Sequence, residues 1–361
     1  MLRPSKYPLL GYVLKNIELP DVVVPQEFVE VNLQPEVGEE AYKKGAKMLD
    51  DFFREELQKY LTPELDPLGR EIIEIGAVKL NQDREVTDTF HALICPQVYR
   101  NIHPRTNEII HIDIEELQKG APFPEVVERF LEWCGENYYF AIWGTADLME
   151  LQRNMEYYGL QPLAEKPFIF YDVQKLFSIY TEGVQNPRAL EYAVDYFDIE
   201  KNLRFHSAIA DAEYTARVFQ KIEKEIVDNY YSLDYYHPPK TKEDEVYVIY
   251  NNYTKRISCT YDTKEELMED NDIKYMVCCQ CGKKAAKKTK WFSNNMKNYS
   301  CLAMCREHGY LKGKIRVYKT GEGKSFAVKI VKLITEENAE QLRERYMQIK
   351  EKKRVKRSSR H

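Results

Sequence analysis

Two patterns of apolar and polar positions alternate between residues 39 and 226. Short runs rich in β-branched and aromatic residues are followed by segments whose apolar residues recur every three or four positions. Strands that alternate with helices in this way are typical of an α/β layer with a mixed sheet. The predicted strands span residues 71–80, 88–96, 138–144 and 167–174, and the predicted helices span residues 39–60, 123–135, 147–159, 189–199 and 207–226.

Beyond the two prolines at 238 and 239, the pattern becomes that of paired strands. One hairpin is predicted over residues 246–261 and another over 314–333, with a short helix between them at 264–270. The end of the chain predicts a charged helix. The predicted organisation is an α/β domain over residues 25–225, a linker over 226–245, a small β-rich domain over 246–335 and a charged helical tail over 336–361.

The composition is that of a globular protein. The 361 residues are 43% hydrophobic and 31% charged, and no apolar run is long enough to span a bilayer. The first residues contain Lys15 and several prolines, which makes them a poor signal peptide. Five of the eight cysteines lie between residues 278 and 305 in metal-like spacing. We therefore predict a cytoplasmic protein with reduced thiols and no membrane partner.

Three polar residues lie at or near the ends of predicted elements, at positions that suit a catalytic site. His206 precedes the helix predicted from residue 207 and Asp211 lies inside it, in the run FHSAIADAEYTA. Asp147 comes directly after a predicted strand, in AIWGTADLMELQRN. Taken singly, each has an ordinary explanation: Asp147 as a helix N-cap, His206 as a surface histidine and Asp211 as a structural ion-pair partner. Their order and context favour one shared site.

This set of motifs resembles the DEDDh family of 3′–5′ exonucleases. The run around His206 and Asp211 matches the family's third motif, H-x-A-x-x-D-A, position for position, and the run around Asp147 matches the second. The resemblance covers roughly residues 28–225 and implies an RNase H-like fold, a mixed sheet with flanking helices. It also implies that Asp147 and Asp211 bind Mg²⁺ or Mn²⁺, and that His206 is the general base in removing nucleotides from 3′ ends.

The chemistry of phosphodiester hydrolysis agrees with these roles. Two divalent ions can supply a nucleophile at neutral pH and neutralise the charge of the transition state. Hard cations prefer oxygen ligands, so several carboxylates are needed close together. A histidine titrates near neutrality and can accept the proton of the attacking water.

The family's first motif, D-x-E on the opening strand, has no clear counterpart in this sequence. In the register that we favour, Asn32 and Gln34 of FVEVNLQ occupy these positions, because their side chains share one face of an alternating strand. Two other registers would place Asn16 with Glu18, or Lys59 with Leu61, at the motif.

Amides in place of carboxylates would weaken a metal site at Asn32 and Gln34. The charge of the four-carboxylate set would fall from about −4 to about −2, and each lost pair of unit charges 4 Å apart is worth on the order of 4 kcal/mol at an effective dielectric constant near 20. We therefore predict an exonuclease fold whose activity is weakened or lost. If these strand residues do not face the metal, carboxylates such as Glu18, Glu30 or Glu74 would supply the ligands.

Two metal-binding knuckles are predicted near the C-terminus. Cys278 and Cys281 form one, Cys305 and His308 form the other, and a glycine follows each. Together they would give a closed Cys₃His site for a structural Zn²⁺ ion, which would stabilise the fold of a small zinc-ribbon-like domain. Cys301 competes with His308 as the fourth ligand.

The same region is strongly basic. Residues 274–333 hold fifteen Lys or Arg against two Glu, a formal charge of +13 in a chain whose net charge is −5. This charge predicts a contact with single-stranded RNA or DNA, and Trp291 and Phe292 would offer stacking surface unless they fill the small domain's core. The predicted contact residues are Lys283, Lys284, Lys287, Lys288 and Trp291.

Three functions compete on this sequence. The first is a metal-dependent 3′–5′ exonuclease acting on single-stranded 3′ ends, and the second is a catalytically inactive nuclease fold that binds nucleic acid. The third is a zinc-ribbon interaction protein with a nuclease-like scaffold, and it ranks last because Asp147, His206 and Asp211 are retained. The choice between RNA and DNA and the oligomeric state are left open.

Overall fold

The computed structural model describes residue 68 and residues 70–98, 114–181, 187–293 and 295–358, and the fold is that of these residues. They fall into two compact units. The first contains the described residues up to Ile75 together with His91–Arg129 and Arg153–Leu160, and the second contains Gly76–Phe90, Phe130–Gln152 and Gln161–His361. Among the helices described, none combines the length and the apolar character needed to cross a membrane.

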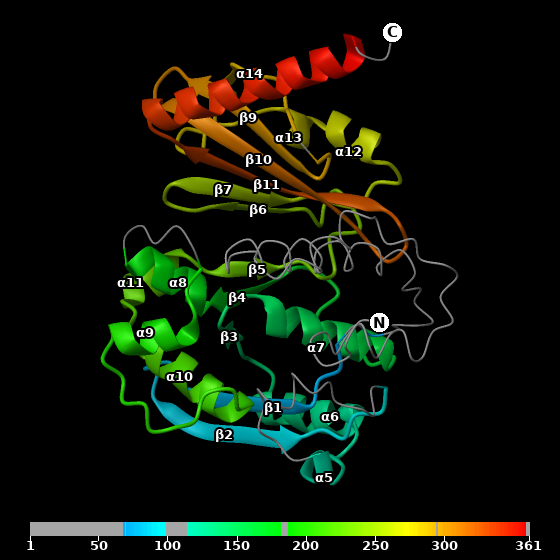
Figure 1. The fold of residues 1–361 in the computed structure, drawn as a ribbon, viewed down its shortest axis with the longest axis vertical. Helices are drawn as coiled ribbons and strands as arrows, with labels where there is room; N and C mark the ends of the chain where they lie inside the picture. The colour runs from blue at the N-terminus through cyan, green and yellow to red at the C-terminus, as the bar shows by residue number, and fades with distance from the viewer. Residues whose placement is uncertain (1–67, 69, 99–113, 182–186, 294, 359–361) are drawn as a thin grey trace, which may run out of the picture. The chain divides into compact units, whose positions relative to one another are not determined.

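Strands and helices alternate through the first part of the described chain (Figure 1). The elements are β1 (Glu74–Leu80), β2 (Val86–Leu93), α5 (Ile114–Leu117), α6 (Phe123–Cys134), β3 (Ala141–Ile142), α7 (Ala146–Tyr157), β4 (Phe168–Asp172), α8 (Val173–Tyr180), α9 (Leu190–Tyr196), α10 (Ala208–Lys221), α11 (Lys224–Asn229) and β5 (Ser232–Asp234). β1 pairs with β2, while β4 pairs with β3 in parallel and with β5 in antiparallel. The predicted α/β class with a mixed sheet is therefore confirmed. The helix predicted over residues 39–60 lies outside the described residues.

Several elements end earlier than the sequence pattern predicts, and two of these ends have a clear local cause. The strand predicted over residues 167–174 ends at Asp172, whose side chain caps α8 by accepting a hydrogen bond from the backbone N–H of Lys175 at 3.0 Å. The helix predicted over residues 207–226 breaks at Ile222, which has an extended ψ of 134° and a side chain that is 1% exposed. Burial of this apolar side chain outweighs the gain from continuing the helix.

One hydrophobic core in the second unit joins α8, α9, α10 and α11. Its buried members are Val173, Leu176, Phe177, Ala193, Val194, Tyr214, Val218, Phe219, Ile222 and Val227. Tyr214 is fully buried, and its hydroxyl donates to the carbonyl of Leu203 at 2.8 Å and accepts from the N–H of Leu203 at 2.9 Å. This core holds α10, the helix that carries Asp211.

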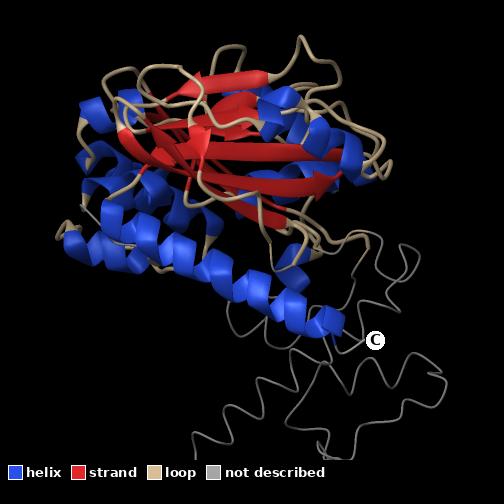
Figure 2. Cartoon of the chain, turned by 90° about the horizontal axis from the view of Figure 1, so that it is seen from above, coloured by secondary structure: helices blue, strands red, loops and turns tan. Residues whose placement is uncertain are grey.

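The C-terminal part is built on a six-stranded sheet in the order β6–β7–β11–β10–β9–β8. Figure 2 shows the strands of the chain in red, seen from above. The elements are β6 (Val246–Ile249), β7 (Tyr253–Ile257), α12 (Lys264–Glu269), α13 (Asn271–Lys274), β8 (Ala286–Lys287), β9 (Asn298–Cys305), β10 (Gly309–Lys319), β11 (Ser325–Leu333) and α14 (Glu336–Ser358). Its hydrogen-bonded neighbours are antiparallel. Both predicted hairpins are present, and β9 is a strand that the sequence pattern did not predict.

The segments predicted to be a linker and a tail both pack against other elements of the structure. Within residues 226–245, β5 pairs with β4, and Leu233 packs in a core with Ile257 and Phe326 of the C-terminal sheet. α14 lies across β9 and buries Leu342 in a core that contains Leu302 (Figure 1). The domain boundaries themselves stay a prediction.

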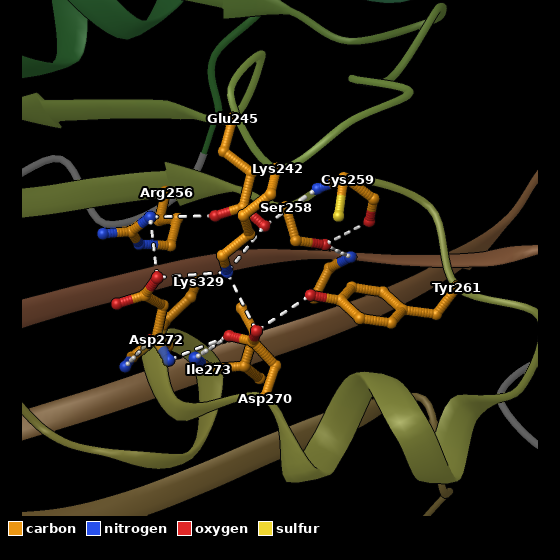
Figure 3. A network of polar contacts seen from close by, with 11 residues as sticks. Lys242, Glu245, Arg256, Ser258, Cys259, Tyr261, Asp270, Asp272, Ile273 and Lys329 are labelled. Carbon is orange, nitrogen blue, oxygen red and sulfur yellow. Dashed lines mark hydrogen bonds and ion pairs between the residues drawn. The ribbon is translucent and has the colours of Figure 1, made fainter.

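A network of charges holds α12 and α13 against β7 (Figure 3). The amine of Lys242 contacts carboxylates of Glu245, Asp270 and Asp272 at 3.1, 2.9 and 3.0 Å. Arg256 contacts Glu245 at 2.9 Å, and the side chain of Glu245 is only 3% exposed. Burial alone would lower the pKa of Lys242, but its hydrogen bonds to the three carboxylates raise that pKa instead.

Candidate active site and metal centre

Asp147 lies at the start of α7, directly after β3. Gly144 adopts a φ of 89° between the strand and the helix, a conformation that glycine adopts without strain. α7 begins at Ala146, so Asp147 lies inside its first turn rather than at the N-cap. The strand–turn–helix context expected of the second motif is therefore present.

His206 and Asp211 are held together at the start of α10. His206 has a φ of 72°, a left-handed conformation that costs a non-glycine residue about 1–3 kcal/mol. Its backbone N–H donates to Oδ1 of Asp211 at 3.3 Å, and Ser207 follows as the N-cap of the helix. His206 is exposed, so its ring is accessible to solvent. Strained backbone of this kind often occurs where function constrains a residue.

A glycine in β1 allows the strand to approach α10 closely. A Cβ atom on Gly76 would lie 2.2 Å from the backbone nitrogen of Ile209 and 2.3 Å from the carbonyl carbon of Ala208. A side chain there would push the strand away from the first turn of α10. The run EIIEIG therefore contributes to the position of Asp211 through the contact between Gly76 and this helix.

The carboxylates of α7 and α10 influence one another. Partial burial, and then the negative charges of Asp211 and Glu150, raise the pKa of Asp147. Glu150 was not among the predicted site residues, although it lies one helical turn after Asp147 and is 9% exposed. The i, i+3 spacing of Asp147 and Glu150 was the available signal. Mutual repulsion among acidic groups of this kind is relieved by a divalent cation, which suits oxygen ligands.

The first-motif residues cannot be placed in this site. Asn32 and Gln34, as well as the two other registers, lie outside the described residues. Glu74, an alternative ligand, contacts Nε2 of His91 at 2.8 Å through its own carboxylate. In the part of the chain that the structure describes, no group of three or more convergent ligands includes Asp147 or Asp211.

Four residues near the C-terminus form a group that could hold a metal ion. The ligand atoms of Cys278, Cys281, Cys305 and His308 all lie within 4.8 Å of one another. Nδ1 of His308 lies 3.7 Å from Sγ of Cys278 and 3.7 Å from Sγ of Cys305, and the Sγ atoms of Cys281 and Cys305 are also 3.7 Å apart. A tetrahedron with metal–sulfur bonds of about 2.3 Å has sulfur–sulfur edges of about 3.8 Å, so these spacings suit four-coordinate Zn²⁺.

The local folds of the two knuckles explain this convergence. Gly282 and Gly309 have φ values of 67° and 86°, so each knuckle closes with a left-handed glycine. The N–H of Glu307, and then the ring of His308, lower the pKa of Cys305 to about 6, which favours the thiolate. Cys301 lies outside the group, because its buried sulfur points to the carbonyl of Thr289 at 3.3 Å. Of the two candidates for the fourth ligand, His308 is the one that converges.

The predicted nucleic-acid contact residues have different surroundings. The four lysines are exposed, but Lys283 pairs with Glu307, and Lys284 lies 4.3 Å from the ring centre of Tyr275. The stacking role of Trp291 does not fit the structure, because its ring packs into two core clusters and its Nε1–H donates to the carbonyl of Lys274 at 3.0 Å. The structure agrees with the alternative that Trp291 fills the core. The lysines are exposed residues whose binding role stays a prediction.

Family models match two segments of the chain. The family described as Exonuclease matches residues 62–219, and a domain of unknown function, DUF4914, matches residues 1–92. The DNA polymerase III PolC-type of Thermotoga petrophila is 34% identical over 163 residues, and that of Thermotoga maritima is 30% identical over 162 residues. Each alignment covers 44% of this chain and 11% of the relative. The chain thus spans about a tenth of the length of these curated relatives.

Solved structures with partial similarity include two exonucleases. The nuclease domain of 3′hExo, a DEDDh family member bound to rAMP, is 19% identical, with a TM-score of 0.38 over 42% of this chain and 80% of that one. A full-length 3′-exonuclease is 18% identical, with a TM-score of 0.38 over 42% of this chain and 71% of that one.

The exonuclease match contains all three residues of the candidate active site, Asp147, His206 and Asp211. It begins at residue 62, so Asn32 and Gln34 lie outside it. Residues 62–219 of this chain are therefore similar to the exonuclease family in sequence.

Proposed function

We propose that this protein is a metal-dependent 3′–5′ exonuclease that acts on the 3′ ends of single-stranded RNA or DNA. The observation that carries the proposal is the proximity of the acidic groups of α7 and α10, with His206 directly before α10. Such a cluster is destabilised by its own charge unless a cation balances it. A cluster of this kind therefore favours a catalytic role.

Each residue has a defined part in the proposed reaction. Asp147 and Asp211 would hold Mg²⁺ or Mn²⁺, which supplies charge neutralisation and an activated nucleophile when bound. His206 would accept a proton from the attacking water, because it is exposed directly before α10 and its backbone N–H contacts Asp211. Glu150 adds negative charge near Asp147. We further propose that the activity is weakened, because Asn32 and Gln34 would replace two metal-binding carboxylates.

The Cys₃His group is proposed to bind structural Zn²⁺. Four protein ligands complete a tetrahedron and leave no position for a substrate. Cys278 and Cys281 lie before β8, whereas Cys305 and His308 connect β9 to β10, so the ion would join separate parts of the sheet. The ion would therefore act on folding rather than on chemistry.

Trimming of end-labelled single strands tests the proposal. Purified protein would be incubated with RNA and DNA of about 20 nucleotides in Mn²⁺ or Mg²⁺. Asp147→Asn and His206→Ala should abolish trimming, whereas Asp228→Asn, at an exposed residue that pairs with Lys224, should not. Metal-dependent trimming that persists in Asp147→Asn would refute the proposed site.

A catalytically inactive module is the second candidate. It is favoured by the lack of a D-x-E motif in the first strand. In this case wild-type protein would bind the labelled strands but would not shorten them. Asn32→Asp combined with Gln34→Glu would then increase metal binding if the favoured register is right.

A further inference from the structure

One face of β10 carries a row of basic side chains. Positions alternate along the strand, so Lys312, Lys314 and Arg316 share a face. The neighbouring Leu311 and Ile315 are fully buried on the other face. Lys332 of β11 lies directly opposite Lys312. We call Lys312, Lys314, Arg316, Lys332 and the nearby Arg345 of α14 the basic stripe.

The charges of the basic stripe are not balanced by carboxylates. Among the described residues, none of its five members forms an ion pair, and all except the half-buried Lys312 are exposed. Burial, and then the charges of Lys332, Lys314 and Arg345, lower the pKa of Lys312. Like charges directly opposite one another in a sheet are destabilising. The stripe therefore reduces stability and would be stabilised by an anionic partner.

The elements around the basic stripe give it a defined width and direction. α14 packs along β9 through Leu302, which borders the stripe on one side. At the end of the row, Arg316 lies 5.0 Å from the ring centre of Tyr318, and the hydroxyl of Tyr318 is 3.0 Å from that of Tyr235, next to β5. Alternate side chains on a strand are about 6.7 Å apart. A row of charges at this spacing, one strand wide, suits one extended phosphodiester chain.

We propose that the basic stripe binds the phosphate backbone of a single-stranded polynucleotide. The inference rests on the proposed exonuclease function, because the bound strand would be the substrate. The proposed nucleic-acid contact is therefore β10, in the middle of the sheet, rather than the lysines at 283–288 that the sequence predicts. Lys283 there already pairs with Glu307, whereas the stripe has no such partner among the described residues. Attraction between unpaired cations and phosphates is the main source of affinity for such a chain.

Two variants with equal charge loss test the basic stripe. The first combines Lys312→Gln, Lys314→Gln, Arg316→Gln and Lys332→Gln, and the second combines Lys283→Gln, Lys284→Gln, Lys287→Gln and Lys288→Gln. Binding to fluorescein-labelled 20-mers of deoxythymidine and of uridine would be measured by anisotropy between 50 and 200 mM salt. The buffer would contain no divalent ion and no chelator, so that the strands stay intact and the Cys₃His site is not stripped.

The stripe variant should weaken binding by at least about tenfold and reduce the slope of log K against log salt by up to about 2.8, which is four charges at about 0.7 each. The second variant should change the affinity less than about threefold. Equal losses in the two variants, or tighter binding of a duplex than of the single strand, would overturn the proposal. Arg316→Lys, which keeps the charge, should bind as wild type does, and circular dichroism would confirm that each variant folds.

A small substrate separates this proposal from the exonuclease proposal. Hydrolysis of a nitrophenyl ester of thymidine monophosphate requires the site at Asp147 but no extended strand. The stripe variant should hydrolyse it at the wild-type rate, and a loss of that rate would contradict a pure binding role. If the wild-type protein hydrolyses neither the labelled single strands nor the nitrophenyl ester, the exonuclease proposal fails. The anisotropy comparison of the two variants still decides whether the basic stripe binds nucleic acid.

Discussion

Glu245 offers the sharpest test of how the C-terminal part is held together. Its side chain is 3% exposed and accepts from the amine of Lys242 at 3.1 Å, from Arg256 at 2.9 Å and from the N–H of Cys259 at 3.1 Å (Figure 3). Glu245→Gln keeps the shape but removes the charge. Hydrogen bonds to a charged group contribute about 1.5–3 kcal/mol each.

The exposure of the partners sets the expected size of this effect. Lys242 is 44% exposed and Arg256 is 20% exposed, so water screens part of the interaction. We therefore expect Glu245→Gln to lower the free energy of unfolding by about 2–3 kcal/mol. Urea unfolding followed by tryptophan fluorescence would measure it, because Trp291 lies in the neighbouring core.

Glu269→Gln is the matched control for this change. Glu269 pairs with Lys274 on the same part of the chain, but its side chain is 73% exposed. An exposed ion pair contributes between about 0 and 1 kcal/mol, so this variant should lose less than half as much as Glu245→Gln. Equal losses in the two variants would refute the assignment of stability to the buried network.

Three further predictions concern the site and its supports. Gly76→Ala should lower the melting temperature by several degrees, because the new Cβ would meet the backbone of Ile209, whereas Gly321→Ala, with open space around it, should not; similar shifts would contradict the close approach. Folding raises the pKa of Asp147, so the contribution of this group to stability is fully present below the ordinary aspartate pKa and is lost as pH rises through the raised folded pKa. Without divalent ions, Asp147→Asn should therefore be more stable than wild type near neutral pH, and a less stable variant in urea unfolding would contradict this. Cys281→Ser should lose zinc from about one ion per chain and unfold the C-terminal sheet, whereas Cys301→Ser should keep its zinc, as measured by elemental analysis; zinc retained in Cys281→Ser would exclude the proposed ligand set.

Local sequence patterns predicted most of the elements, because side-chain periodicity and caps act over a few residues. The strands around Gly76 and Phe170 and the helix at Asp147 are examples. α8 was missed because a strand runs directly into it, and only the cap by Asp172 separates the two. The sequence pattern does not predict β9, because its cysteines also suit metal ligands, whereas in the structure Cys301 is fully buried as a strand residue of the sheet.

The exonuclease-like motifs and their order, the two cysteine knuckles and the excess of positive charge near the C-terminus can all be recognised in the amino-acid sequence. Contacts between distant segments depend on the tertiary structure: Asp211 acts on Asp147, His308 rather than Cys301 joins the metal group, and Trp291 lies in the core. Periodicity is a property of neighbouring residues, whereas contact between distant segments depends on how apolar faces pack. For the same reason, the sequence predicts the positive charge of residues 274–333 but not the row of basic side chains along β10, which form no ion pair with the other residues that the structure describes.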